Sequence, residues 1–144
     1  MAACALALAV SIVKADSPAE VAAGWGLLGT WKVDCSTPTS RDNMAETYAV
    51  KDGALFEFRD LGELHDVNPV RAAHVDGEGR LVVAIEFPSV GGLIRENVMS
   101  KSADRKRTVE NHRLDHAGVT VHDGRFTGSG EPTPWFQRCE GLKS

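Results

Sequence analysis

Polar side chains interrupt two neighbouring stretches that otherwise read as β-strands. The stretches are Arg95-Glu96-Asn97 and Glu110-Asn111-His112-Arg113. Because side chains alternate between the two faces of a strand, both faces of each stretch carry polar groups. Inside a protein such groups need hydrogen-bond partners or a ligand, since burying an unpaired charge is costly. The chemistry available here is the recognition of a small molecule by amide and guanidinium groups.

The alternation leaves open which face of these strands points inward. If the face of Arg95 is inward, the candidate ligand-binding residues are those on that face and one tyrosine whose hydroxyl can point into a cavity: Tyr48, Arg95, Asn97, Asn111 and Arg113. If that face is outward, Arg95 and Glu110 would form a cross-strand ion pair worth a few tenths to about 1 kcal/mol. Both readings stay open at this point.

Residue spacing gives no support for a metal site or for a catalytic centre. His112, His116 and His122 gather near one expected hairpin, but a spacing of four places two ligands on one face only in a helix. The sequence has no motif that pairs a nucleophile with a base and no phosphate-binding glycine loop. We therefore expect a protein that is not an enzyme and that uses no cofactor.

Composition and charge describe an ordinary globular chain. The 144 residues are 42% hydrophobic, and the formal net charge is -4. An acidic chain offers no basic field for nucleic acid, so no nucleic-acid partner is expected. One basic cluster is predicted to lie in a solvated turn between two strands: Lys101, Arg105, Lys106 and Arg107.

The N-terminus has the features of a targeting segment. An apolar run over residues 2–13 is too short to span a bilayer comfortably, and Val13-Lys14-Ala15 places small residues where a signal peptidase reads. We predict a signal peptide over residues 1–15, a single β-barrel domain over 16–144, and a periplasmic or secreted location with no membrane span. The alternative is an N-terminal buried helix of a cytosolic protein.

Two cysteines remain after the predicted cleavage, Cys35 and Cys139. In an oxidising compartment a pair of cysteines is most simply one disulfide. A catalytic thiol is the alternative, but neither cysteine has a local signature for that role.

Most of the chain consists of short alternating stretches separated by turn residues, which is typical of an antiparallel all-β domain. Ser17-Pro18-Ala19-Glu20 predicts a short helix with a capping box, and residues 29–35 the first strand. The segment 61–68 reads as irregular and ends before Pro69. The larger aromatic side chains are expected in the core: Trp25, Trp31, Phe56, Phe58, Phe87 and Trp135.

The segment Leu28-Gly29-Thr30-Trp31-Lys32-Val33 resembles the opening of the calycins, which include the lipocalins and the intracellular fatty-acid-binding proteins. The resemblance implies an antiparallel up-and-down barrel of about eight strands, with Trp31 at its closed end and Arg138 packed across that tryptophan. The segment 133–139 also looks like the C-terminus of small bacterial secreted proteins of no assigned activity. A Cys35–Cys139 disulfide would bring the first and last strands together, as barrel closure requires.

The expected function is that of an exported lipocalin-like protein that binds a small apolar ligand in the barrel. Two alternatives stay open. A non-enzymatic envelope protein that binds or inhibits a protein partner through its surface predicts a filled core and an exposed apolar or charged patch. A hydrolase or isomerase predicts a perturbed carboxylate or histidine in an open cavity, for which Glu96 and His112 are the candidates.

Overall fold

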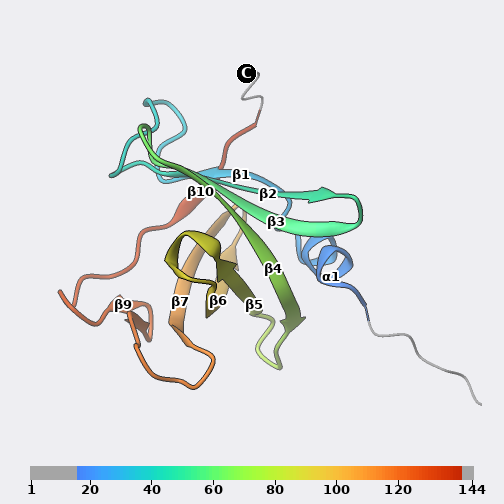
Figure 1. Ribbon diagram of the computed structural model, residues 1–144. Coiled ribbons are helices and arrows are strands. Elements are labelled where there is room, and N and C mark those ends of the chain that lie inside the picture. The colour runs from blue at the N-terminus through green and yellow to red at the C-terminus, as the bar shows by residue number, and fades with distance from the viewer. Residues whose placement is uncertain (1–15, 141–144) are drawn as a thin grey trace, which may run out of the picture.

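A computed structural model describes residues 16–140 (Figure 1). The predicted signal peptide, residues 1–15, lies outside the described residues. The described chain forms an antiparallel barrel that closes on itself, because β10 pairs with both β1 and β7. The strands of the closed barrel are β1 (Gly29–Lys32), β2 (Ala45–Lys51), β3 (Ala54–Asp60), β4 (His65–Val75), β5 (Leu81–Phe87), β6 (Leu93–Ser102), β7 (Arg105–Arg113) and β10 (Phe136–Arg138). The predicted all-β barrel of about eight strands is confirmed.

Short connections join consecutive strands from β2 to β7, as in an up-and-down barrel. Between β2 and β3, Asp52 and Gly53 have φ values of 52° and 79°, the two positive angles of a tight hairpin turn. A second hairpin of this kind, β8 (Val121–His122) and β9 (Arg125–Phe126), extends from β7 beyond the closed barrel. A single turn of 3-10 helix, η1 (Pro88–Val90), lies between β5 and β6.

Strand β4 differs from the prediction, because it begins at His65 and runs through Pro69. Proline gives up a backbone donor, which argues against a strand interior. Pro69 pairs with Phe56 of β3. The pairing of β4 with β5 shifts register between Val70 and Ala72, close to Pro69, and we infer that this irregularity is why the proline is tolerated. The irregularity places the missing N–H beside a bulge.

The helix α1 (Pro18–Trp25) closes one end of the barrel. Ser17 and Glu20 form the predicted capping box, and Gly26 ends the helix with a φ of 92°. Figure 1 shows α1 beside the end of β4 and below the β2–β3 hairpin. The buried core fills this half of the barrel: Ala22, Trp25, Leu27, Trp31, Tyr48, Leu55, Val70, Leu81, Val83, Ile85 and Met99.

The barrel closes at a short seam where β1 meets β10. Only two residue pairs, Trp31 with Arg138 and Lys32 with Gln137, join these strands. The predicted disulfide joins Cys35 to Cys139 just beyond the seam, with a Cα–Cα distance of 5.4 Å. The Arg138 guanidinium lies 4.3 Å from the centre of the Trp31 ring, the position that the resemblance implies for it.

Arg138 also explains the glycine that precedes Trp31 by two positions. Its guanidinium donates hydrogen bonds to the carbonyls of Gly26 and Leu28. A Cβ at Gly29, where φ is 124°, would lie 2.8 Å from Arg138 Nη1. The glycine therefore leaves room for the arginine that connects the last strand to the end of the helix.

The prediction that the basic cluster lies in a solvated turn is wrong, because Lys101 belongs to β6 and Arg105, Lys106 and Arg107 belong to β7. The turn between β6 and β7 is confined to Ala103 and Asp104. Lys106 belongs to β7 and is 2% exposed. Lys106 pairs with Phe136 of β10, the strand that closes the barrel. Because side chains alternate along β7, this pairing turns the Lys106 side chain into the barrel.

Candidate functional site

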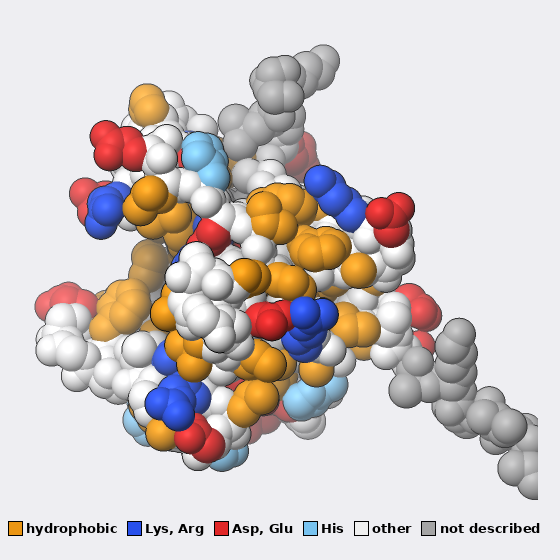
Figure 2. Space-filling model, in the orientation of Figure 1, with side chains coloured by type: hydrophobic (Ala, Val, Ile, Leu, Met, Phe, Trp, Pro, Cys, Tyr) orange, Lys and Arg blue, Asp and Glu red, His pale blue; other side chains and the backbone are white. Residues whose placement is uncertain are grey.

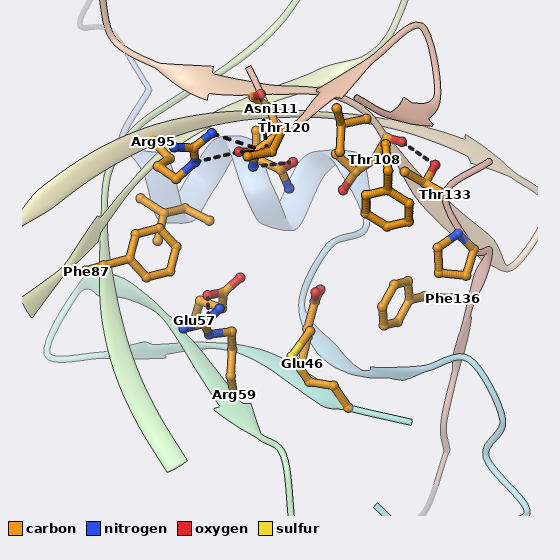
Figure 3. A pocket seen from close by; sticks show the side chains of 16 residues that line it. Glu46, Glu57, Arg59, Phe87, Arg95, Thr108, Asn111, Thr120, Thr133 and Phe136 are labelled. Carbon is orange, nitrogen blue, oxygen red and sulfur yellow. Dashed lines mark hydrogen bonds and ion pairs between the residues drawn. The ribbon is translucent and has the colours of Figure 1, made fainter. Parts of the chain in front are cut away.

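A cavity of about 370 Å³ occupies the half of the barrel that lies away from α1. Its size is within the range of sites that hold small molecules. The close-up in Figure 3 shows its side chains converging from opposite walls. The lining residues are Met44, Glu46, Glu57, Arg59, Ile85, Phe87, Arg95, Asn97, Thr108, Asn111, Thr120, Val121, Phe126, Thr133, Pro134 and Phe136.

Strands β6 and β7 place three of the predicted ligand-binding residues in this lining: Arg95, Asn97 and Asn111. Arg95 Nε donates to Asn111 Oδ1 at 2.6 Å, and Asn111 Nδ2 donates to Asn97 Oδ1 at 3.3 Å. The alternative ion pair of Arg95 with Glu110 is wrong, because Glu110 instead accepts the backbone N–H of Asp123 and contacts His122.

A bulge in β7 decides which of its side chains reach the cavity. Val98 pairs with Glu110 and Met99 with Thr108, so one extra residue of β7 lies between these pairs. Thr108 and Asn111 therefore both line the cavity although they are three positions apart.

The other two predicted ligand-binding residues do not line the cavity. Arg113 is half-exposed outside it and pairs with Asp115 at 3.3 Å. Tyr48 is 1% exposed beneath the cavity, in the core. Its hydroxyl donates to Glu57 Oε2 at 2.9 Å, so it acts through that carboxylate.

Strands β2 and β3 supply charged residues that the sequence analysis did not identify: Glu46, Glu57 and Arg59. The prediction that Phe56 and Phe58 lie in the core is wrong, because the alternation of β3 turns Glu57 and Arg59 inward instead. The register between β1 and β2 shows why Glu46 faces the interior. Trp31 lies directly opposite Glu46, which places the carboxylate on the same face as the core tryptophan.

Glu57 is the most deeply buried carboxylate of this group, at 4% exposure. Asn68 Nδ2 donates to its Oε1 at 3.1 Å, and Tyr48 donates to its other oxygen. Burial is the main cause that raises the pKa of Glu57 to about 7, and the neighbouring charge of Glu46 adds to the effect. Burial and the Glu57 charge also raise the pKa of Tyr48, which keeps its hydroxyl a donor.

Glu57 is expected to make stability fall as the pH rises from about 4.5 to about 7. The folded state holds the proton of Glu57 to higher pH than the unfolded chain does, so the contribution is complete below the unfolded pKa of 4.5 and lost above the folded value. Its size is about 3 kcal/mol. In urea unfolding across this range, Glu57→Gln should show a flatter profile than the unsubstituted protein. Glu96→Gln, on the outer face of β6, is the control, and parallel profiles for all three proteins would contradict the assignment.

Glu46 forms an ion pair inside the barrel with Lys106. The distance from Lys106 Nζ to Glu46 Oε2 is 2.7 Å. The ammonium also lies 4.8 to 5.5 Å from the ring centres of Trp31, Tyr48 and Phe136. The carboxylate and the aromatic faces together replace the water that this charge gives up.

Arg95 stands on the opposite wall with uncharged partners. Besides Asn111, its Nη2 donates to the carbonyl of Gly118 at 2.6 Å and to Thr120 Oγ1 at 3.2 Å. Partial burial and the nearby Arg113 lower the pKa of Arg95 from its usual value. Within residues 16–140, no carboxylate lies within ion-pair distance of its guanidinium.

Comparison of the chain with protein-family models, with curated proteins and with solved structures finds no match. The fold and the cavity by themselves define the structural class of the protein: a closed antiparallel β-barrel with a partly charged internal cavity. In the part of the chain that the structure describes, no helix has the length and apolar character needed to cross a membrane.

Proposed function

We propose that this protein is an exported, lipocalin-like barrel that binds a small molecule in its internal cavity, without catalysing a reaction. The observation that carries the proposal is the division of the barrel interior. Core side chains fill the half beside α1, while about 370 Å³ stays open in the other half. Ile85, Phe87 and Phe136 supply apolar wall there, and amide and guanidinium groups supply orientation.

Retention of the occupant is expected to depend on the open volume. In native mass spectrometry of the mature chain purified from its own cells, an extra mass should be present and should leave on denaturation. Thr108→Phe should remove it, because the larger side chain fills cavity volume. The Thr108 side chain is free for this change, since the hydrogen bond from Thr133 goes to its backbone carbonyl.

The matched control is Val67→Phe, which adds an aromatic ring on the outer face of β4, where Val67 is 50% exposed. An extra mass that persists in folded Thr108→Phe protein would show that the occupant lies elsewhere. A bare chain from unsubstituted protein would argue against a tightly held occupant.

A surface-binding role is the second candidate, and the outer face of the barrel favours it. Phe56 pairs with Pro69, and Phe58 with Val67, so four apolar side chains form a strip across β3 and β4. Figure 2 shows hydrophobic side chains gathered on this face. Such a strip is what a protein partner would cover. Phe58→Ser would then abolish co-purification of a partner and leave the cavity occupant in place.

An acid–base enzyme is the third candidate, and Glu57 favours it. A carboxyl group with a pKa of about 7 beside an open cavity is suited to proton transfer near neutral pH. The residues first considered for this role do not meet the cavity, since Glu96 and His112 pair with each other on the outer face, 3.8 Å apart. Loss of any detected turnover in Glu57→Gln would favour this role.

A further inference from the structure

The floor of the cavity and the strand beside it carry more carboxylates than cations. Among the described residues, the cations within ion-pair distance of Glu46, Glu57 and Asp66 are Lys106 and Arg59. Lys106 is committed to Glu46 at 2.7 Å, and Arg59 Nε donates to Asp66 Oδ1 at 2.9 Å. The same Nε is 3.7 Å from Glu57 Oε1, which is ion-pair distance but beyond hydrogen-bond distance, so two carboxylates share Arg59. When all five groups are ionised, Glu57 is therefore the carboxylate in excess.

This part of the barrel already holds one buried ammonium group. Lys106 is 2% exposed, and its Nζ is stabilised by one carboxylate and by the faces of aromatic rings. Phe136 belongs both to that group of rings and to the cavity lining. A second ammonium group entering the cavity would meet similar chemistry, with Glu57 as its carboxylate.

The opposite wall has the reverse charge. Figure 3 shows Arg95 with Asn111 and Thr120 on one side of the cavity and Glu46, Glu57 and Arg59 on the other, with Phe87 and Phe136 at the flanks. Arg95 has no carboxylate partner among the described residues, and its neighbour Arg113 has the same charge. A guanidinium group in such surroundings favours a carboxylate or another planar anion.

We propose that the occupant of the cavity is a dipolar small molecule, with an amino group at Glu46 and Glu57, an acidic group at Arg95, and an apolar spacer between them. The inference rests on the proposed function and specifies the class of its ligand. Such a ligand makes the apolar contacts expected from the sequence through its spacer and has, in addition, one charged group at each end. The amino group compensates the carboxylate in excess on the floor, and the acidic group compensates Arg95, which has no carboxylate partner among the described residues.

Binding of the amino group should release a proton from Glu57. An adjacent positive charge favours the ionised carboxylate, so the pKa of Glu57, about 7 in the empty cavity, should fall on binding. The groups that set this pKa come from three strands and are Glu46, Tyr48, Arg59 and Asn68, which also donates to Asp66. Lys106 faces the floor from β7, behind Glu46.

The test is isothermal titration calorimetry of the mature protein at about pH 6 with straight-chain ω-amino carboxylates of about four to eight carbons, a range of sizes that suits the cavity. Alkylamines and alkanoates of the same carbon number are the matched probes, because each keeps one end and the spacer. At the best length, the amino carboxylate should bind about tenfold tighter than either single-ended probe. Titration in buffers of different ionisation enthalpy should show proton release with the amines and the amino carboxylates, and none with the alkanoates.

Two variants test the acidic end and the amino end of the ligand separately. Arg95→Gln should reduce the affinity of the amino carboxylate to that of the alkylamine, and leave alkylamine binding unchanged. Glu57→Gln should reduce it to that of the alkanoate and abolish proton release. The controls are Arg71→Gln and Glu96→Gln on the outer face, where Arg71 pairs with Glu86 and Glu96 with His112. Circular dichroism spectra establish that each variant is folded.

The outcomes distinguish this inference from the proposed function. An alkanoate or alkylamine that binds as tightly as its amino carboxylate would overturn the dipolar assignment and leave the cavity as a binding site. A retained native occupant that lacks either an amine or an acid group would do the same. Failure of all three series to bind, together with a bare chain in native mass spectrometry, would overturn both.

Discussion

Removal of the Cys35–Cys139 disulfide should lower the free energy of unfolding by about 4 to 5 kcal/mol, the largest effect of any single link in the fold. The cysteines are 104 positions apart, and a cross-link that closes a loop of this length removes much of the entropy of the unfolded chain. The measurement is urea unfolding of the double variant Cys35→Ser/Cys139→Ser against the oxidised protein.

The short seam beside the disulfide is a second reason to expect a large loss of stability. β10 is joined to β1 by two residue pairs and to β7 by two more, whereas β2 and β3 share seven. A barrel that opens locally should therefore open here first. Hydrogen exchange of the β10 amides should accelerate in the double variant more than exchange in β3.

The unsubstituted protein treated with reductant serves as the control, since it should reproduce the variant's loss of stability while the variant itself does not respond. A loss below about 1 kcal/mol in both would mean that the seam holds without its cross-link and that the unfolded chain gains little freedom from its removal.

Local signals in the sequence were sufficient for the antiparallel hairpins, whereas the closed barrel was implied by the resemblance of residues 28–33. The capping box at Ser17 and Glu20, the turn at Asp52-Gly53 and the pair of cysteines each depend on chemistry within a few residues or on a simple count. Consistent signals of this kind specify the hairpins, and consecutive hairpins leave few topologies besides a meander.

The inside of the barrel was harder to predict, because a polar interior and a solvated exterior give the same alternating pattern. On β3 the more hydrophobic face, Phe56 and Phe58, lies outside, and the face with Glu57 and Arg59 lies inside. Only the closure of the sheet decides between the faces, and closure depends on pairings distant in sequence, such as β10 with β7. The bulge in β7 is a further example, since nothing local marks the extra residue between Thr108 and Glu110.

The two walls of the cavity illustrate the same limit. Arg95, Asn97 and Asn111 were identified because their strands are neighbours and because polar side chains interrupt both strands. Glu46 and Glu57 were missed because each occurs in a strand with an otherwise ordinary alternation. Tyr48 was noticed for its hydroxyl, but its role follows from its partner Glu57, which lies directly opposite it on β3.

Lys106→Met should lower the free energy of unfolding by about 3 to 5 kcal/mol, because it leaves the carboxylate of Glu46 inside the barrel without its cation. Methionine keeps the length and the apolar contacts of the lysine stem, so the loss reports the charge and not a cavity. Urea unfolding at constant pH measures the loss. Lys101→Met is the matched control. Lys101 also has an ammonium group over an aromatic ring, that of Trp25, but it is exposed and has no carboxylate partner among the described residues.

A double-mutant cycle separates the attraction within the pair from the cost of an unpaired charge. Glu46→Gln/Lys106→Met removes both charges, and its stability should recover most of what Lys106→Met alone loses, since a buried ion pair often contributes little relative to neutral groups of the same shape. If Lys106→Met costs no more than Lys101→Met, water must reach Glu46 in the folded state. The floor of the cavity would then be wet, and an amino group of a ligand would gain little there. If the single variant is severely destabilised and the double variant recovers, the floor is a dry environment in which a carboxylate needs a cation. In such a dry environment, Glu57 would favour a ligand that brings an amino group.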